Sequence, residues 1–128
     1  MKLQIIPRHQ SLFFQTVLGF SLVVILYLAT VPLNQPLPGG LSDKFWHGLC
    51  FVYLAFLGDN AFPERSLFQW TFAPLFLYGV LIEIIQFFIP YRSFSLADMV
   101  ADALGLAVYG GLMLLSSYLY KNLPRHKA

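Results

Sequence analysis

Ionisable side chains interrupt this sequence inside stretches that are otherwise apolar. His47 lies four residues after Asp43, Asp102 lies four residues after Asp98, and Glu83 stands alone in a third stretch. Residues four apart share one face of a helix, so each pair would present a single polar stripe. Imidazole nitrogens and carboxylate oxygens transfer protons and bind divalent metals. These residues could therefore support acid–base or metal chemistry.

Nine polar residues form the candidate site, and they fall near corresponding ends of the apolar stretches. His47, Glu83 and Asp98 are the candidates for catalysis. The candidates for ligand binding are Asp43, Lys44, Gln86, Arg92, Ser95 and Asp102. The two basic side chains among them could hold a phosphate. The sequence contains no HExxH, GxSxG or phosphate-loop motif, so the reaction, any metal and any cofactor stay unidentified.

The same residues also admit a purely structural interpretation, in which they only fasten helices together. The pairs would then join Lys44, His47 and Arg92 to Glu83, Asp98 and Asp102. A charge at the membrane centre costs about 2.5–3.5 kcal/mol on insertion scales, and somewhat less near the interface. Because buried charges must be paired or neutral, we expect Glu83 within hydrogen-bonding or one-water distance of His47, Arg92 or Asp98. A functional pocket is favoured, since ionisable residues that face a cavity in a membrane protein commonly mark one.

The composition predicts that these residues belong to a membrane protein. Of 128 residues, 58% are hydrophobic and 11% are charged, and the mean hydropathy is +0.67. In ordinary soluble domains roughly 45–50% of residues are apolar and about 25% are charged. This chain therefore has too few polar residues to form the surface of a water-soluble protein. The length predicts one membrane domain over residues 1–128, with membrane lipids as partners. The basic residues are scattered and the net charge is only +2, which excludes nucleic acid as a partner.

The fold class predicted is all-α, an integral membrane bundle of four transmembrane helices. The helices are expected at about residues 12–31, 43–58, 67–89 and 96–120. The second is short for a span, which needs about 20 residues, so we expect its neighbours to shield it. Pro74 should kink the third helix. In the fourth, small residues at four-residue spacing predict close helix contact, in two series: Ala101 and Gly105, and Ala103, Ala107 and Gly111.

The distribution of lysine and arginine predicts the orientation. A four-span chain places six basic residues on the side of the termini: Lys2, Arg8, Arg65, Lys121, Arg125 and Lys127. Only Lys44 and Arg92 lie on the other side. Basic residues favour the cytoplasmic side, so we expect a multi-pass protein of the cell (inner or plasma) membrane with both termini cytoplasmic. The first stretch could be a signal peptide, but it is longer than the usual core of about 7–15 residues.

The order and spacing of the polar residues resemble the VanZ-like family of small bacterial membrane proteins. The matching pieces are Asp43-Lys44-x-x-His47, Glu83-x-x-Gln86 and Arg92-x-x-Ser95-x-x-Asp98-x-x-x-Asp102-x-x-Gly105. The resemblance covers about residues 42–111. It implies a four-span protein of the cell envelope, in a family named for a member that raises resistance to the glycopeptide teicoplanin. It implies no settled biochemical activity.

Two positions depart from the family's pattern. Gly48 stands where the family usually has an aromatic residue, and Asp102 stands where it usually has Asn. The additional carboxylate makes the pocket more acidic. We therefore expect one of Glu83, Asp98 and Asp102 to be protonated unless a cation is present.

The function predicted is that of a VanZ-like envelope protein with an outward-facing polar pocket. This pocket would bind, and could modify, a lipid-linked or peptidoglycan-type ligand such as a lipid-linked cell-wall precursor. The resemblance links it to glycopeptide resistance. The alternative is a non-catalytic structural or partner-binding membrane protein whose charges only pack helices, and the sequence leaves open whether the protein is an enzyme. A transporter subunit would need polar residues in the cytoplasmic half, which has almost none.

Overall fold

The regular structure of the chain is entirely helical in the part described by the computed structural model, residues 8–32 and 42–124. Its elements are α1 (Arg8–Thr30), α2 (Asp43–Ala61), the short π-helix η2 (Phe68–Phe72), α3 (Ala73–Phe87) and α4 (Leu96–Asn122). The predicted all-α fold class is confirmed. Against the predicted bounds, α1 begins at Arg8 instead of residue 12, and α2 continues to Ala61 instead of ending at residue 58.

Serine side chains cap the two helices that carry most of the candidate site. The hydroxyl of Ser42 accepts a hydrogen bond from the Phe45 amide at the start of α2, and that of Ser95 accepts one from the Asp98 amide at the start of α4. The first amides of a helix have no partner within the helix, so a serine at this position satisfies one of them. These caps determine where the polar first turns of α2 and α4 begin.

Pro74 lies in the first turn of α3, directly after the π-helical residues of η2. Proline lacks an amide donor, and inside a helix its ring clashes with the carbonyl group four residues earlier. The wider π-helical turn before it absorbs this disruption, and η2 runs into α3 without a break in the helical backbone. The predicted disturbance at Pro74 therefore coincides with a π-helical segment just before α3.

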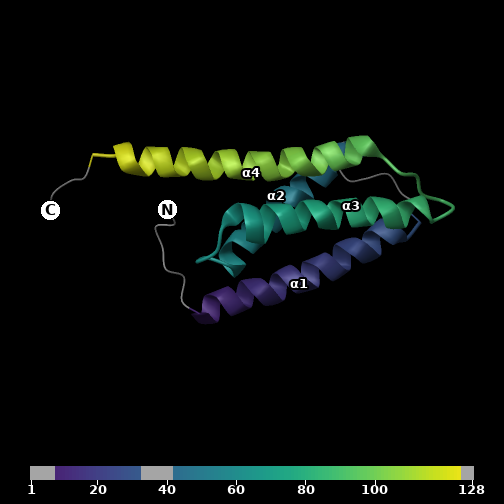
Figure 1. The fold of residues 1–128 in the computed structure, drawn as a ribbon, viewed down its shortest axis with the longest axis horizontal. Coiled ribbons are helices and arrows are strands. Elements are labelled where there is room, and N and C mark those ends of the chain that lie inside the picture. Colours follow the sequence, from purple (N-terminus) through teal and green to yellow (C-terminus); the bar gives the residue numbers. More distant parts are fainter. Residues whose placement is uncertain (1–7, 33–41, 125–128) are drawn as a thin grey trace.

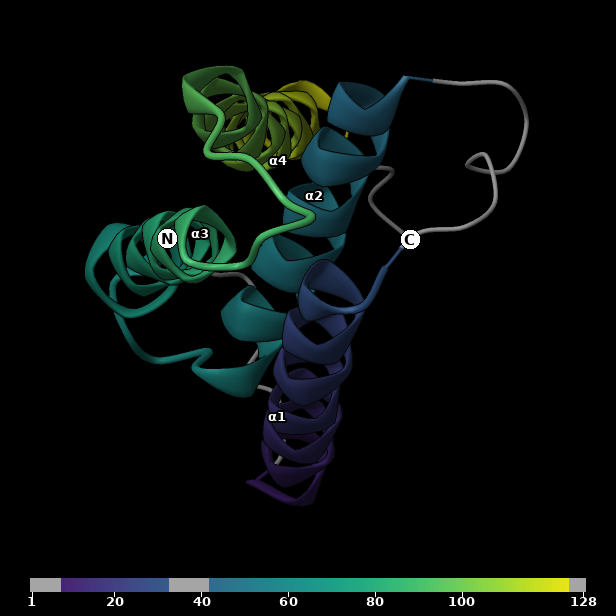
Figure 2. The same cartoon turned by 90° about the vertical axis from the view of Figure 1, so that its right-hand side faces the viewer.

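α2 is the central helix of the bundle. It packs most extensively against α4 and next against α1, while α3 contacts α4 and α1. The start of α1 and the end of α4 lie toward one end of the molecule, and the turn from α3 into α4 lies at the other end (Figure 1). Viewed along α3 and α4, α2 crosses beside both of them (Figure 2). This crossing brings the polar first turn of α2 next to the polar first turns of α4.

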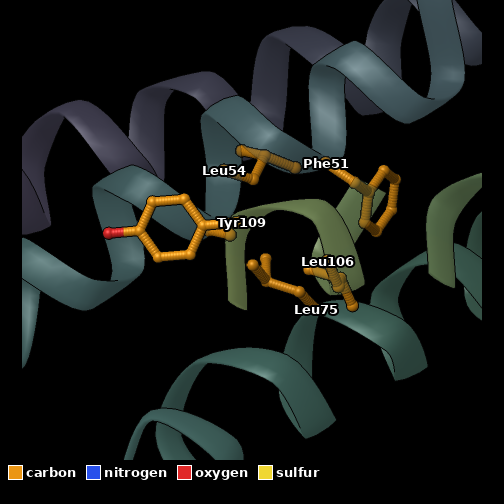
Figure 3. Packing of buried hydrophobic residues seen from close by; sticks show 6 residues of the cluster. Phe51, Leu54, Leu75, Leu106 and Tyr109 are labelled. Carbon is orange, nitrogen blue, oxygen red and sulfur yellow. The ribbon is translucent and has the colours of Figure 1, made fainter. Parts of the chain in front are cut away.

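The apolar core fills the space between α2, α3 and α4. Phe51 and Leu54 of α2 meet Leu75 of α3 and Leu106 and Tyr109 of α4, and all five are nearly inaccessible (Figure 3). In lipid there is little hydrophobic driving force between apolar helices. This core therefore stabilises the bundle through close van der Waals packing.

Two glycines allow α2 and α4 to approach closely. A Cβ atom on Gly105 would collide with the backbone carbonyl of Gly48 and would lie 3.0 Å from the Cβ atom of Phe51. Ala101, one turn earlier on the same face, is also buried. The first predicted series of small residues thus lies at a helix contact. The second series does not: Ala103, Ala107 and Gly111 are exposed, because they lie on the opposite side of α4.

Large apolar side chains are exposed on all four helices, as expected for a surface that faces lipid. Three helical segments are long and apolar enough to cross a membrane, at His9–Thr30, Phe68–Phe87 and Leu96–Asn122. The protein is therefore a multi-pass membrane protein. α2 is not among these three, since its 19 residues include charged and polar side chains at both ends.

Candidate functional site

The candidate residues lie in the first turns of α2 and α4, in the last turns of α3 and in the turn between α3 and α4. That turn lies at the end of the bundle opposite the start of α1 (Figure 1). Side-chain contacts there connect α2 to α4, the turn before α4 to α3, and α3 to the end of α1. The first turns of α2 and α4 and the last turns of α1 and α3 therefore meet at one end of the bundle.

His47 is held between two aspartates of α4. Its Nδ1 lies 3.1 Å from Oδ1 of Asp102, and its Nε2 lies 3.5 Å from Oδ2 of Asp98. The imidazole is partly accessible, at 23% of its side-chain surface, whereas the two carboxylates are almost fully buried. With the proton on Nδ1, His47 donates a hydrogen bond to Asp102, and Nε2 is then available to accept a proton or bind a ligand.

Asp98 also forms an ion pair with the other helix. Nζ of Lys44 lies 2.9 Å from its Oδ1, and the lysine side chain is half exposed. Asp43 lies beside this pair: one ligand atom each from Asp43, His47 and Asp98 falls within 4.8 Å of the others. We refer to Asp43, Lys44, His47, Asp98 and Asp102 as the His47 cluster.

Glu83 is fully buried in the last turns of α3, next to the His47 cluster. Its Oε2 accepts a hydrogen bond of 2.9 Å from the Ser95 amide, while Oε1 has no hydrogen-bond partner among the described residues. The predicted partners were His47, Arg92 and Asp98, and no direct hydrogen bond to any of them is present in the described part of the chain. The direct partner of Oε2 is the Ser95 amide, because the amides at the start of a helix need acceptors. A contact of Glu83 with one of the three side chains through a water stays a prediction.

Arg92 and Gln86 do not point toward the His47 cluster as the sequence suggested. One Nη atom of Arg92 donates hydrogen bonds to the carbonyls of Val31, at 2.5 Å, and Leu28, at 3.2 Å. Nε2 of Gln86 donates to the carbonyl of Ala29 at 2.9 Å. The last carbonyls of a helix lack partners within the helix, so these side chains cap α1. The predicted pairing of Arg92 with a carboxylate is replaced by this cap.

Tyr91 belongs to the same cap, a role that its place in the sequence does not predict. Its hydroxyl donates a hydrogen bond of 2.6 Å to the carbonyl of Thr30. The acceptors on α1 are backbone carbonyls, which every residue has, so no residue type in the sequence marks them. Only the need of a helix end for donors could have suggested such a contact.

Gly79 leaves the space that Asp102 occupies. A Cβ atom on Gly79 would lie 2.7 Å from Oδ2 of Asp102 and 3.0 Å from the ring of Phe51. Asp102 is 2% exposed, so its carboxylate lies between α2, α3 and α4, in contact with His47 on one side and Gly79 on the other. The absence of a side chain on α3 is thus what allows this carboxylate to support the imidazole.

A comparison with families of known proteins found a match over most of the chain. The model of the VanZ/LLP1 family matches residues 8–117. The chain belongs to the VanZ/LLP1 family. The resemblance suggested by the polar residues is confirmed, and the match extends over α1 as well. No curated protein and no solved structure matches the chain. In this VanZ/LLP1 protein, the residues that carried the resemblance meet at one end of the bundle, and Arg92 and Gln86 secure α1 there.

Proposed function

We propose that this VanZ/LLP1 protein binds the headgroup of a lipid-linked, peptidoglycan-type ligand at the His47 cluster, on the outer side of the bacterial plasma membrane. The observation that carries this proposal is the position of His47, held between the carboxylates of Asp98 and Asp102 and still partly accessible. Carboxylate and imidazole groups accept hydrogen bonds from the hydroxyl and amide groups of such a headgroup. The lipid chain would remain in the surrounding bilayer.

In the proposed orientation the chain crosses the membrane four times, and both termini lie on the cytoplasmic side. The excess of basic residues near the termini supports this orientation. α2 supports a fourth crossing, because Phe45, Leu49, Tyr53 and Phe56 form an exposed apolar stripe along one face. Neighbouring helices cover its other face, which compensates for its low hydropathy. A crossing by α2 puts the His47 cluster at the outer surface.

Chemistry beyond binding would fall to His47. Its Nε2 can take up and release a proton, and the Asp102 carboxylate stabilises the protonated ring. Binding or modification of a cell-wall precursor would connect the protein to the glycopeptide resistance that the family resemblance implies.

The second candidate function is structural, and the observation that supports it is the network of contacts between the helices. The pair of Lys44 with Asp98 and the pair of His47 with Asp102 fasten α2 to α4, and Glu83 fastens α3 to the backbone of Ser95. A protein that only needed these fastenings would gain nothing from a partly accessible imidazole or from an unpartnered carboxylate oxygen on Glu83.

Analysis of lipids that co-purify with the protein distinguishes the two. Wild-type protein, purified in mild detergent from its membrane, should be enriched in a lipid-linked peptidoglycan precursor. Protein with Asp98→Asn should lose that enrichment, and protein with Glu64→Gln, an exposed acid outside the cluster, should retain it. Equal precursor content in all three proteins, or none in wild type, would reject the proposed function and leave the structural role.

A further inference from the structure

Three ligand atoms of the kind that bind divalent metals converge at the accessible side of the His47 cluster. They come from Asp43 and His47 in the first two turns of α2 and from Asp98 in the first turn of α4, and each lies within 4.8 Å of the other two. Lys44 pairs with Oδ1 of Asp98, which leaves Oδ2 facing Nε2 of His47 at 3.5 Å. One imidazole nitrogen and two carboxylates therefore surround one position.

Asp102 sets the orientation of the imidazole toward that position. Its Oδ1 lies 3.1 Å from Nδ1 of His47. In metal sites the ligating histidine almost always donates its other ring N–H to a carboxylate or a carbonyl, which fixes the tautomer and strengthens the ligand. The pair of Asp102 and His47 has this arrangement, with Nε2 left as the ligand.

Negatively charged side chains outnumber positively charged ones around this position. Among the described residues, four carboxylates lie in or beside the cluster, on Asp43, Glu83, Asp98 and Asp102, against one ammonium group, that of Lys44. Arg92, the other basic residue near this end, binds the carbonyls of α1. Residues 33–41, which connect α1 to α2, contain no charged side chain. A bound cation would provide the positive charge that these carboxylates need.

Glu83 provides a second, independent observation of the same need. The residue is 0% exposed, and its Oε1 has no hydrogen-bond partner among the described residues. Its carboxyl group interacts electrostatically with His47, Asp98 and Asp102, so Glu83 lies beside the cluster. A buried carboxylate oxygen without a donor is costly, and a nearby cation reduces that cost.

We propose that Asp43, Nε2 of His47 and Asp98 bind one divalent transition-metal cation of the Zn²⁺ or Mn²⁺ class. A mixed set of imidazole and carboxylate ligands suits these ions better than Mg²⁺ or Ca²⁺, which prefer oxygen alone. Three protein ligands leave a coordination position open for an oxygen of the bound ligand. For the identity of that ligand the inference rests on the proposed function, in which the cation holds a phosphate or hydroxyl oxygen of the headgroup.

Zn²⁺ is the probe that tests the cation site. Untagged full-length protein in detergent is stripped with a chelator, dialysed against Zn²⁺ and analysed for bound metal per chain. Wild type should bind one Zn²⁺, and His47→Gln and Asp43→Asn should weaken binding at least about tenfold, since even residues that only support a metal ligand contribute 10–100-fold. Asp43 is exposed, so Asp43→Asn should leave the melting temperature unchanged. His9→Gln and Glu64→Gln, both exposed and outside the cluster, are the controls and should bind like wild type.

Failure of the cation site and failure of the proposed function give different results. Wild-type protein that binds neither Zn²⁺ nor Mn²⁺, or Asp43→Asn and His47→Gln variants that bind as wild type does, would overturn the cation site. Co-purification of the lipid-linked precursor would then decide the proposed function separately. A third result is that wild type binds one Zn²⁺ per chain, both variants lose it, and wild type is not enriched in the precursor. That result would establish the cation site and reject the proposed ligand.

Discussion

The imidazole of His47 on α2 is supported by the buried carboxylate of Asp102 on α4, with 3.1 Å between Nδ1 and Oδ1. This contact joins the two helices that pack most extensively, and it leaves Nε2 directed toward Asp98. The contact needs a hydrogen-bond acceptor at position 102, which a carboxylate or a neutral amide could provide. An Asn side chain also has an oxygen that accepts the hydrogen bond from Nδ1.

Asp102→Asn should therefore preserve both the fold and Zn²⁺ binding, whereas Asp102→Ala should not. The alanine removes the acceptor and leaves a buried polar group of His47 unsatisfied, which costs about 1–3 kcal/mol. The measurements are the melting temperature in detergent and the amount of protein in the membrane. A fall in stability with Asp102→Asn as large as that with Asp102→Ala would show that the negative charge, and not the hydrogen bond, is required.

Gly79→Ala should destabilise the bundle, because the new Cβ atom would lie 2.7 Å from Oδ2 of Asp102 and 3.0 Å from the ring of Phe51. Overpacking of this kind typically costs about 1–3 kcal/mol. The matched control is Gly19→Ala in α1, where no atom of the described residues beyond the local helix backbone lies within 4 Å of the added atom. The fraction of protein that survives heating, measured by gel filtration, should fall for Gly79→Ala alone. Equal survival of the two variants would contradict the close contact between Gly79 and Asp102.

Arg92→Met should lower stability without lowering the Zn²⁺ affinity of the protein that remains folded. Its guanidinium group caps the last carbonyls of α1 through Val31 and Leu28, and hydrogen bonds from charged groups contribute about 1.5–3 kcal/mol. The experiment combines thermal unfolding with Zn²⁺ dialysis of the soluble fraction. Normal stability together with weakened Zn²⁺ binding would place Arg92 in the site and not at the end of α1.

Single cysteines test the orientation. In a background with Cys50→Ala, which removes the only cysteine, Phe94→Cys lies in the turn between α3 and α4 and Asn122→Cys lies at the end of α4. Both positions are exposed. A membrane-impermeant maleimide added outside intact cells should label the variant at position 94 and not the one at position 122. The opposite labelling would place the His47 cluster on the cytoplasmic side.

The sequence predicts the His47 cluster better than it predicts the contacts around it. Asp43 and His47 on one helix and Asp98 and Asp102 on another reveal their shared faces by their spacing, and the structure brings those faces together. The partner of Arg92 could not be predicted in the same way. It is a set of backbone carbonyls on α1, and only the three-dimensional arrangement places α1 within reach.

The two series of small residues in α4 show a second limit of the sequence. Both have the spacing of a helix contact, yet only Ala101 and Gly105 lie at one. The deciding feature is the polar face: Gly105 follows Asp98 and Asp102 on the side of α4 that turns inward, and the series beginning at Ala103 lies on the other side. Spacing indicates that a helix can make a close contact, and the polar residues indicate which face makes it.

The central claim is that the His47 cluster serves the cell envelope as a binding site and does not merely pack helices. Glycopeptide sensitivity of cells that carry wild-type protein, His47→Gln or Asp102→Asn, compared at equal membrane abundance, tests it most directly. Gln at position 47 can still donate to Asp102 but can neither be protonated nor replace the imidazole as a ligand. We predict that cells with His47→Gln become as sensitive as cells without the protein, while those with Asp102→Asn resemble wild type. Wild-type sensitivity in cells with His47→Gln would contradict the binding site and support the structural role.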